Sequence, residues 1–264
     1  ETALGQGFAM GVGMAFAEAY LADITKSDDL EQKVVDHYTY VLATDGDLQE
    51  PVALGAAAIA GHLGLKKLVV YYDANDAQIS GTVSRSDSVD YATVFDGLGW
   101  NVQTIDGHDH SAMHFAIETA KVMDKPSIII GNTIMAKGSA SMEKDHNTHG
   151  APLPQDEIDL TKEKLGLPDK KFYVPAEVIE HFRTRFSDLT NEAEKWSVRF
   201  GQLSKDSNFK NIIENTIGEN MVSGLKMPDF DSGKTLATRK AFGAVLDSIA
   251  DSLPQLVGGS ADLE

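Results

Sequence analysis

Apolar runs that end at turn residues recur along the first half of the chain. Four of these runs are typical of strands: residues 38–44, 68–72, 100–105 and 127–134. After Pro51, the residues Val52, Ala56, Ile59 and Leu63 follow helical spacing, and a second helical pattern precedes the fourth run. Strands that alternate with helices predict an α/β fold, a doubly wound and mostly parallel sheet with helices on both faces. The strands are nearly continuous apolar runs, as burial on both faces requires.

The chain changes character beyond this sheet. Residues 5–22 are rich in Gly, Ala and Met, which predicts a helix packed closely against a neighbour through Gly7 and Gly11. Residues 156–217 contain charged helical segments, and residues 218–235 are rich in Gly, Pro, Asp and Ser, as in a linker. A helix at 237–249 and a short strand at 256–257 follow. We therefore expect a domain at 1–217, a linker at 218–235 and the beginning of a second α/β domain at 236–264.

Composition narrows the classes of function. The 264 residues include 23 Lys and Arg against 40 Asp and Glu, a net charge of −17, which disfavours nucleic acid and anionic lipid as partners. The absence of cysteine excludes a disulfide scaffold, a thiolate zinc site and a cysteine nucleophile, and suits a reducing cytoplasm. No basic leader precedes the apolar stretch 8–17, so we expect neither a signal peptide nor a membrane span. Both ends of the sequence interrupt patterns that are typical of structured segments, so we expect the chain to be a fragment of a longer protein.

Two polar side chains follow neighbouring strands of the predicted sheet. Asp45 comes directly after the first strand, and Asn75 follows the second. Ligands bind at the carboxyl ends of strands in such sheets, and hard oxygen donors suit Mg²⁺ or Ca²⁺. Because two side chains cannot fill an octahedral shell, phosphate oxygens would complete it, which indicates a magnesium–diphosphate site. A plain turn at Asp45 and a cap at Asn75 remain the alternative.

Several motifs carry a resemblance to a known family. Asp45-Gly46, followed thirty residues later by Asn75, resembles the thiamine diphosphate motif, which reads Gly-Asp-Gly and then Asn. Other stretches agree with one branch of that group: 4–7, 105–109, 149–153, 237–240 and 258–263. The chain therefore resembles the transketolase family over essentially its whole length, and the His-Gly-Ala-Pro-Leu stretch from His149 separates it from other thiamine diphosphate enzymes.

The resemblance implies a role for several residues around the diphosphate. Asp45 and Asn75 would be the side-chain ligands of Mg²⁺, with Ca²⁺ as a possible substitute, and Ala77 would add its backbone carbonyl. Asn75 would also touch the diphosphate of thiamine diphosphate. Gly46 would let the backbone approach that group, and Leu4 would pack against the cofactor.

The resemblance implies further roles at the substrate and at a subunit interface. His149, the catalytic candidate, would contact both the diphosphate and the sugar, and Arg239 would bind the substrate's phosphate. Asp262 would approach the cofactor held by a partner subunit. Glu50 would lie near a homodimer interface, in a carboxylate network that links two cofactor sites.

The sequence departs from the family pattern at the diphosphate motif and in the opening segment. Thr44 stands where the motif has its first glycine, and Thr2 and Ala3 replace residues of the family's opening segment. Asp47 adds a negative charge beside the diphosphate site, which would weaken anion binding if the side chain pointed inward.

The function implied by the resemblance is that of a transferase of the pentose phosphate pathway in the cytoplasm. It would move a two-carbon ketol unit from a ketose phosphate to an aldose phosphate, with thiamine diphosphate and Mg²⁺ as cofactors. The alternatives are another thiamine diphosphate carboligase or decarboxylase, or an inactive fragment of such an enzyme. We expect the isolated 264-residue chain to be inactive, because the family's site lies between two subunits and uses residues that this chain lacks.

Overall fold

The computed structural model describes residues 4–26, 33–217, 224–253 and 255–259. The chain divides into two compact units. The first comprises Glu1–Asp23 and Val35–Arg185, and the second comprises Ile24–Val34 and Phe186–Glu264. The sheet and almost all of the predicted diphosphate site belong to the first unit.

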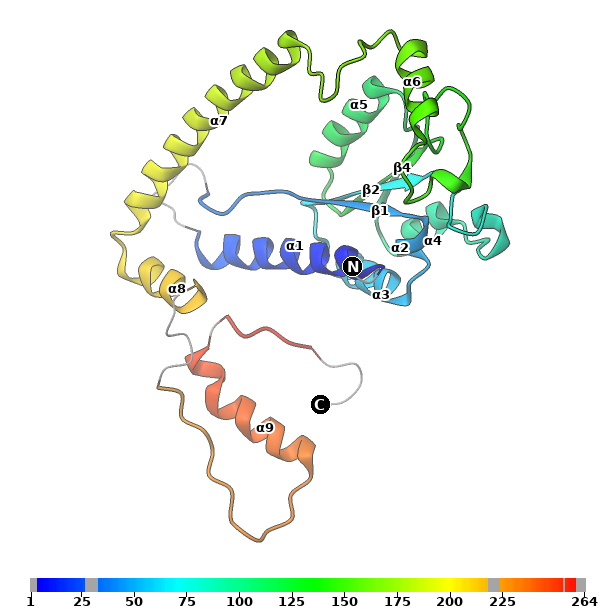
Figure 1. The fold of residues 1–264 in the computed structure, drawn as a ribbon. Coiled ribbons are helices and arrows are strands. Elements are labelled where there is room, and N and C mark those ends of the chain that lie inside the picture. Colours follow the sequence, from blue (N-terminus) through cyan, green and yellow to red (C-terminus); the bar gives the residue numbers. More distant parts are fainter. Residues whose placement is uncertain (1–3, 27–32, 218–223, 254, 260–264) are drawn as a thin grey trace. The chain divides into compact units, whose positions relative to one another are not determined.

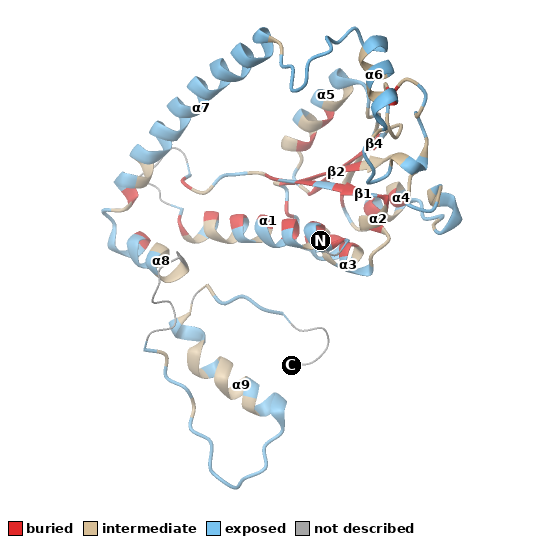
Figure 2. Ribbon diagram, in the orientation of Figure 1, coloured by how far each residue is buried: buried red, intermediate tan, exposed pale blue. Residues whose placement is uncertain are grey.

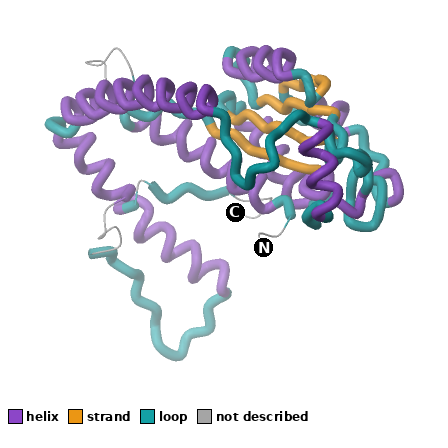
Figure 3. The backbone as a smooth tube through the Cα atoms, turned by 45° about the horizontal axis from the view of Figure 1, so that its top comes forward, coloured by secondary structure: helices purple, strands orange, loops and turns teal. Residues whose placement is uncertain are grey.

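The first unit is built on a parallel sheet of four strands. They are β1 (Thr39–Thr44), β2 (Leu68–Ala74), β3 (Asn101–Asp106) and β4 (Ser127–Asn132). Their order across the sheet is β1-β2-β4-β3, and every neighbouring pair is parallel (Figures 1 and 3). The structure thus confirms the predicted parallel α/β sheet and all four strands, although β4 ends at Asn132 rather than at residue 134.

Helices precede, connect and follow the strands. In the first unit they are α1 (Gln6–Ile24), α2 (Asp45–Leu48), α3 (Pro51–Leu63), α4 (Tyr91–Gly97), α5 (His110–Lys121) and α6 (Gln155–Lys164). Short 3₁₀ turns occupy Val83–Arg85 and His146–Thr148. The helix α7 (Ala176–Leu203) begins in the first unit and continues into the second, where α8 (Ser207–Ile217) and α9 (Thr238–Ile249) follow, with a 3₁₀ turn at Ala250–Ser252.

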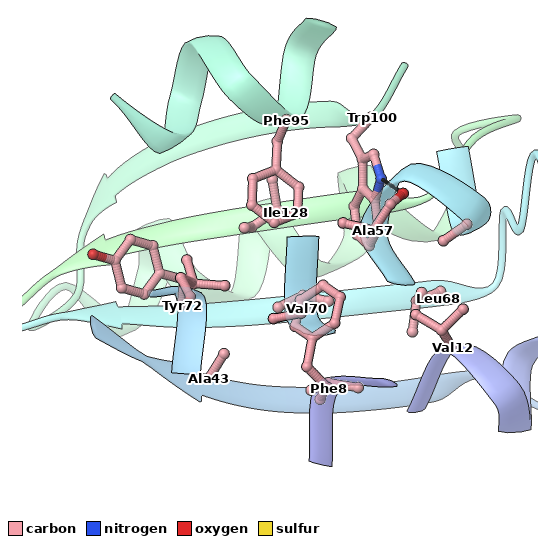
Figure 4. Packing of buried hydrophobic residues seen from close by; sticks show 14 of the residues in the cluster. Phe8, Val12, Ala43, Ala57, Leu68, Val70, Tyr72, Phe95, Trp100 and Ile128 are labelled. Carbon is pink, nitrogen blue, oxygen red and sulfur yellow. Dashed lines mark hydrogen bonds between the residues drawn. The ribbon is translucent and has the colours of Figure 1, made fainter. Parts of the chain in front are cut away.

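One face of the sheet carries the main hydrophobic core. Side chains of α1, α3 and α4 pack there against the alternate strand residues that point to this side, as Figure 4 shows for Phe8, Val70, Phe95 and Trp100. The Trp100 indole donates a hydrogen bond of 2.9 Å to the carbonyl of Ala57, so its polar atom is satisfied inside the core. This core holds α3 in place, and α3 in turn positions the short helix α2 that directly precedes it.

On the opposite face, α5 packs against part of the sheet. Ala116 and Ala120 of this helix pack against Val69 and Ile129, which alternate with the residues of the main core. Helices therefore lie on both faces of the sheet, as the sequence predicted (Figure 1).

The edge strand β1 departs from the predicted two-sided burial. Thr39, Val41 and Ala43 are buried, whereas Tyr40 and Leu42 on its other face are exposed (Figure 2). The expectation of burial on both faces holds for most of β2 and β4 but is wrong for the two edge strands, β1 and β3, because β3 has only half-buried and exposed residues. In the described part of the chain, α5 packs against β3, β4 and β2 and leaves this face of β1 open.

The second unit contains a small core of its own. Val34, Leu203 and Phe209 are buried there, and Trp196 donates a hydrogen bond of 2.9 Å to the carbonyl of Val34. The predicted helix at 237–249 is confirmed as α9, but the predicted strand at 256–257 is wrong, because the backbone there is irregular. The predicted linker lies partly outside the described residues, and its described part, 224–235, has no helix or strand. No helix in the described ranges has the length and apolar character needed to cross a membrane.

Candidate metal and diphosphate site

Asp45 lies at the carboxyl end of β1, where the strand turns into the short helix α2. Its side chain is buried, with an exposed fraction of 4%. The hydroxyl of Tyr72, on the adjacent strand β2, donates a hydrogen bond to Asp45 Oδ1. Asp45 Oδ2 is buried and has no hydrogen-bond partner among the described residues. The carboxylate therefore keeps one oxygen without a protein partner.

Burial dominates the electrostatics of this carboxyl group. Desolvation raises the pKa of Asp45 above its ordinary value, and the negative charges of Asp73 and Asp76 raise it further. The hydrogen bond from Tyr72 and the nearby backbone N–H of Asn75 act in the opposite direction and lower this pKa. A cation bound to Oδ2 would offset the cost of burying the charge.

Asn75 is held in one orientation by both ends of its amide. Its Nδ2 donates a hydrogen bond of 2.9 Å to Asp73 Oδ2, and its Oδ1 accepts one of 3.0 Å from the backbone N–H of Ala77. Asp73 in turn accepts a hydrogen bond from the hydroxyl of Thr133, which follows β4. The amide oxygen keeps a second lone pair, so Asn75 can still act as a metal ligand.

The pairing of β1 with β2 brings the two predicted ligands to one edge of the sheet. Thr44 lies opposite Asp73, so Asp45 and Asn75 continue from neighbouring strand ends. Asn75 and Ala77 also line a cavity of about 380 Å³. Its other lining residues come from loops at the same edge: Asp76, Gly81, Thr82, Thr133, Ile134, Met135, Lys144 and His146.

Leu4 and Gly46 lie together at the start of α2. A methyl group added at Gly46 would stand 3.4 Å from Leu4 Cδ1, and the Leu4 side chain is more than half exposed. Leu4 thus leaves an apolar surface beside the backbone of Gly46, where the sequence predicts cofactor contact.

Asp47 is engaged by its own surroundings. Its Oδ1 accepts a hydrogen bond of 2.9 Å from the N–H of Gly5, and its Oδ2 accepts bonds from the N–H and the hydroxyl of Thr44 at 2.9 and 3.0 Å. The two departures from the family motif, Thr44 and Asp47, therefore hydrogen-bond to each other. Hydrogen-bond donors of Gly5 and Thr44 therefore surround the negative charge of Asp47, which lies next in sequence to the predicted diphosphate site.

The histidines of the site are divided between two loops. His146 lines the cavity, whereas His149 is an exposed residue just after the same 3₁₀ turn and does not line it. His108, which follows β3, supports the loop that follows β4, because its Nε2 accepts a hydrogen bond of 2.9 Å from the N–H of Ile134.

One further predicted residue of the first unit, Glu50, does not line this cavity. Glu50 directly precedes α3 and lies close to the N-terminal turn, since a methyl group on Gly5 would stand 2.8 Å from Glu50 Cβ. Arg239 is an exposed residue in the first turn of α9 and belongs to the second unit. Asp262, Thr2 and Ala3 lie outside the described residues.

The donor set fits a hard divalent cation that brings most of its ligands with it. Asp45 offers a buried oxygen without a partner, and Asn75 and Ala77 offer amide and backbone oxygens. Within the ranges that the structure describes, no three His, Cys, Asp or Glu side chains converge as a complete protein metal site. Water and diphosphate oxygens would therefore have to complete the shell, as Mg²⁺ commonly requires.

Sequence reasoning missed the residues that orient these ligands. Tyr72 holds Asp45, and Asp73 with Thr133 holds Asn75. Lys144, which also lines the cavity, has a left-handed backbone with φ of 67°, an unusual conformation for a residue other than glycine. The only sequence signal for Tyr72 and Asp73 was their place at the end of the strand before Asn75.

Comparisons with known proteins bear on this site. The family model described as transketolase, thiamine diphosphate binding domain, matches residues 1–219. The chain belongs to the transketolase family. A curated transketolase from Staphylococcus aureus (strain MRSA252) is 40% identical over 98% of this chain. Solved transketolases from Leishmania mexicana and Pichia stipitis are similar, with TM-scores of 0.90 and 0.87, identities of 34% and 31%, and coverage of 99% and 98% of this chain.

The match covers only part of each relative. The chain spans 40% of the length of the S. aureus transketolase and 39% of each of the two solved chains. The transketolase resemblance drawn from the motifs is thus confirmed, and the matched region is the part that the family model describes as binding thiamine diphosphate.

Proposed function

We propose that this chain is the diphosphate-binding part of a transketolase and that the complete gene product transfers a two-carbon ketol unit from a ketose phosphate to an aldose phosphate. The observation that carries the proposal is the pairing of the family match with a site of the required chemistry. Asp45 and Asn75 continue from adjacent strand ends, and Asp45 keeps a buried oxygen without a described partner.

In this proposal the first unit would hold the metal ion. Asp45, Asn75 and the carbonyl of Ala77 would bind Mg²⁺, with Ca²⁺ as a substitute, and Asn75 would also touch the diphosphate. Leu4 would support the cofactor over the backbone of Gly46. The chemistry that bound thiamine diphosphate supplies is attack on the ketose carbonyl and transient storage of the two-carbon unit.

The substrate contacts are proposed on the resemblance. His149 would contact the sugar and the diphosphate, and Arg239 would bind the substrate's phosphate through its planar guanidinium group. The Pichia stipitis structure is described as a complex with sedoheptulose 7-phosphate, which supports sugar phosphates as the substrate class. Glu50 and Asp262 would act at the interface of a homodimer with shared sites.

The domain division and the setting complete the proposal. We divide the chain into a diphosphate-binding domain at 1–217, a linker at 218–235 and the beginning of a pyrimidine-binding domain at 236–264. The end of the family match at residue 219 supports the first boundary. A cytoplasmic role in the pentose phosphate pathway is proposed from the resemblance to transketolases.

The test is an assay of ketol transfer with the complete gene product. Activity should require both thiamine diphosphate and a divalent cation, and removal of the cation with a chelator should abolish it. Asp45→Asn should reduce activity and cation binding together, because it removes the charged ligand. Transfer that proceeds without either cofactor would overturn the proposal.

A further inference from the structure

The two oxygens of Asp45 have different environments. Oδ1 accepts a hydrogen bond from the hydroxyl of Tyr72, whereas Oδ2 is buried and lacks a hydrogen-bond partner in the part of the chain that the structure describes. Oδ2 is therefore the oxygen that faces a cation without competition, and the hydrogen bond on Oδ1 disfavours binding of one cation through both oxygens. The hydroxyl of Tyr72 in this way biases how Asp45 coordinates.

Tyr72 is held firmly in this position. It is buried in the main core, with an exposed fraction of 6%, and its ring packs edge-on against Tyr91 at a centroid distance of 5.8 Å. The hydroxyl of Tyr91 donates a hydrogen bond of 2.7 Å to Asp87, which fixes the second ring. Packing and hydrogen bonding together leave the Tyr72 hydroxyl little freedom to release Asp45.

We propose that Tyr72 is a positioning residue that makes Asp45 a one-oxygen ligand and thereby favours Mg²⁺ over Ca²⁺ at this site. The inference rests on the proposed function and adds a determinant of metal selectivity to it. Mg²⁺ accepts single carboxylate oxygens in a compact octahedral shell of about six ligands. Ca²⁺ takes roughly six to eight oxygens and often binds both oxygens of one carboxylate, a mode that the hydrogen bond from Tyr72 to Oδ1 disfavours.

The experiment compares Tyr72→Phe with Tyr71→Phe. Tyr71 is the preceding residue on β2 and belongs to the opposite core cluster, so its variant removes a hydroxyl from the same strand without touching Asp45. The complete gene product with thiamine diphosphate is titrated separately with Mg²⁺ and Ca²⁺ by calorimetry. Thermal unfolding without metal reports whether each variant is folded.

Tyr72→Phe should lower the Mg²⁺ affinity by about 10- to 100-fold, the usual effect of losing a partner of a metal ligand. Its Ca²⁺ affinity should fall less or rise, because Oδ1 becomes available, so the ratio of Mg²⁺ to Ca²⁺ affinity should drop. Tyr71→Phe should leave that ratio unchanged. General structural damage would weaken both ions alike, which the ratio detects.

Equal losses for both ions, or no loss, would overturn the inference. If Tyr72→Phe fails to fold, Tyr91→Phe takes its place, because it frees the supporting ring while Asp45 and Tyr72 remain intact. A smaller fall in the same ratio is then expected, and an unchanged ratio would contradict the proposal. Wild-type protein that binds neither ion with thiamine diphosphate present would instead overturn the proposed function itself.

Discussion

Asp47 joins the N-terminal turn to the end of β1. Asp47→Ala would leave the N–H groups of Gly5 and Thr44 without their carboxylate acceptor. It would thereby release the segment that carries Leu4. We expect a loss of about 1–2 kcal/mol in the free energy of unfolding, the scale of a lost cap. We also expect weaker binding of thiamine diphosphate, measured by calorimetry, since Leu4 would no longer be held beside Gly46.

A second helix cap provides the matched control for this variant. Asp109 accepts hydrogen bonds from the N–H groups of Ser111 and Ala112 at the start of α5. Asp109→Ala should cost similar stability but leave cofactor affinity unchanged. If both variants changed the affinity equally, the effect of Asp47 would be one of stability alone.

At the residue scale, sequence reasoning reached the side chains at strand ends but not their partners. Asp45 and Asn75 were found because a strand end is visible in the hydrophobic pattern. Tyr72 was not distinguishable from the other apolar strand residues, because its contact with Asp45 depends on the pairing of β1 with β2. The orientation of Asp47 also depended on a contact with a distant turn, at Gly5.

At the element scale, α1 approaches the sheet through one glycine. A methyl group at Gly11 would stand 2.3 Å from Val41 Cγ2, whereas one at Gly7 would meet no atom within 4 Å. Gly11→Ala should therefore destabilise the protein by about 1–3 kcal/mol through overpacking. Gly7→Ala should be neutral or stabilise it by up to about 1 kcal/mol, because alanine favours the helix. Thermal unfolding of the two variants measures the difference, and equal effects would contradict this packing.

One face of α6 fastens the loop that leads toward His146 and His149. Glu157 accepts hydrogen bonds of 2.7 Å from both the N–H and the hydroxyl of Ser141. One and two turns further along the helix, Thr161 accepts from Ala140 and Lys164 donates to the carbonyl of Ser139. Glu157→Gln should speed amide hydrogen exchange at residues 139–141, whereas Glu163→Gln on the exposed side of α6 should not.

The same contact predicts a pH dependence. The hydrogen bonds from the backbone and side chain of Ser141 lower the pKa of Glu157 below its ordinary value of 4.5. The stability that the ionised group contributes is therefore present above pH 4.5 and is lost as the pH falls through the lowered pKa. The difference in unfolding free energy between wild type and Glu157→Gln should shrink on acidification below that value. A difference that stays constant with pH would contradict the assignment.

Helical periodicity predicted where α3 lies but not which side it buries. Val52, Ile59 and Leu63 carry the apolar spacing, yet each is more than two fifths exposed, whereas the alanines at 53, 57 and 60 pack against the sheet. Small residues permit a close approach of helix and sheet, which periodicity alone does not reveal. Residues 256–257 have the composition of a strand, but a strand also needs a neighbour with which to pair, and β-propensity does not supply one.

At the scale of the whole molecule, the net charge of −17 opposes the anionic cofactor and substrates that we propose. The field of the surface falls off within about one Debye length, so local groups decide binding at the site. The cation at Asp45 and Asn75, with Lys144 at the cavity, would provide the local positive charge. Such local groups would let the proposed site hold a small anion despite the overall negative charge.

The proposed homodimer predicts what covers the apolar surface of the first unit. Met10 and Met14, one helical turn apart on α1, are 65% and 62% exposed, and Ile59 on α3 is 56% exposed. Met14→Glu should shift the complete gene product from dimer to monomer in sedimentation, weakening association by roughly 100-fold or more. The reason is that a two-fold interface would bury the unpaired charge twice.

Phe115 is 72% exposed and belongs to α5, the helix on the opposite face of the sheet. Phe115→Glu is therefore the matched control and should leave the sedimentation mass of the dimer unchanged. The monomeric variant should also lose ketol transfer, because the proposed sites are shared between subunits. A Met14→Glu protein that remains dimeric would place the interface elsewhere. A fully active monomer would contradict shared sites while leaving the metal-binding proposal at Asp45 and Asn75 intact.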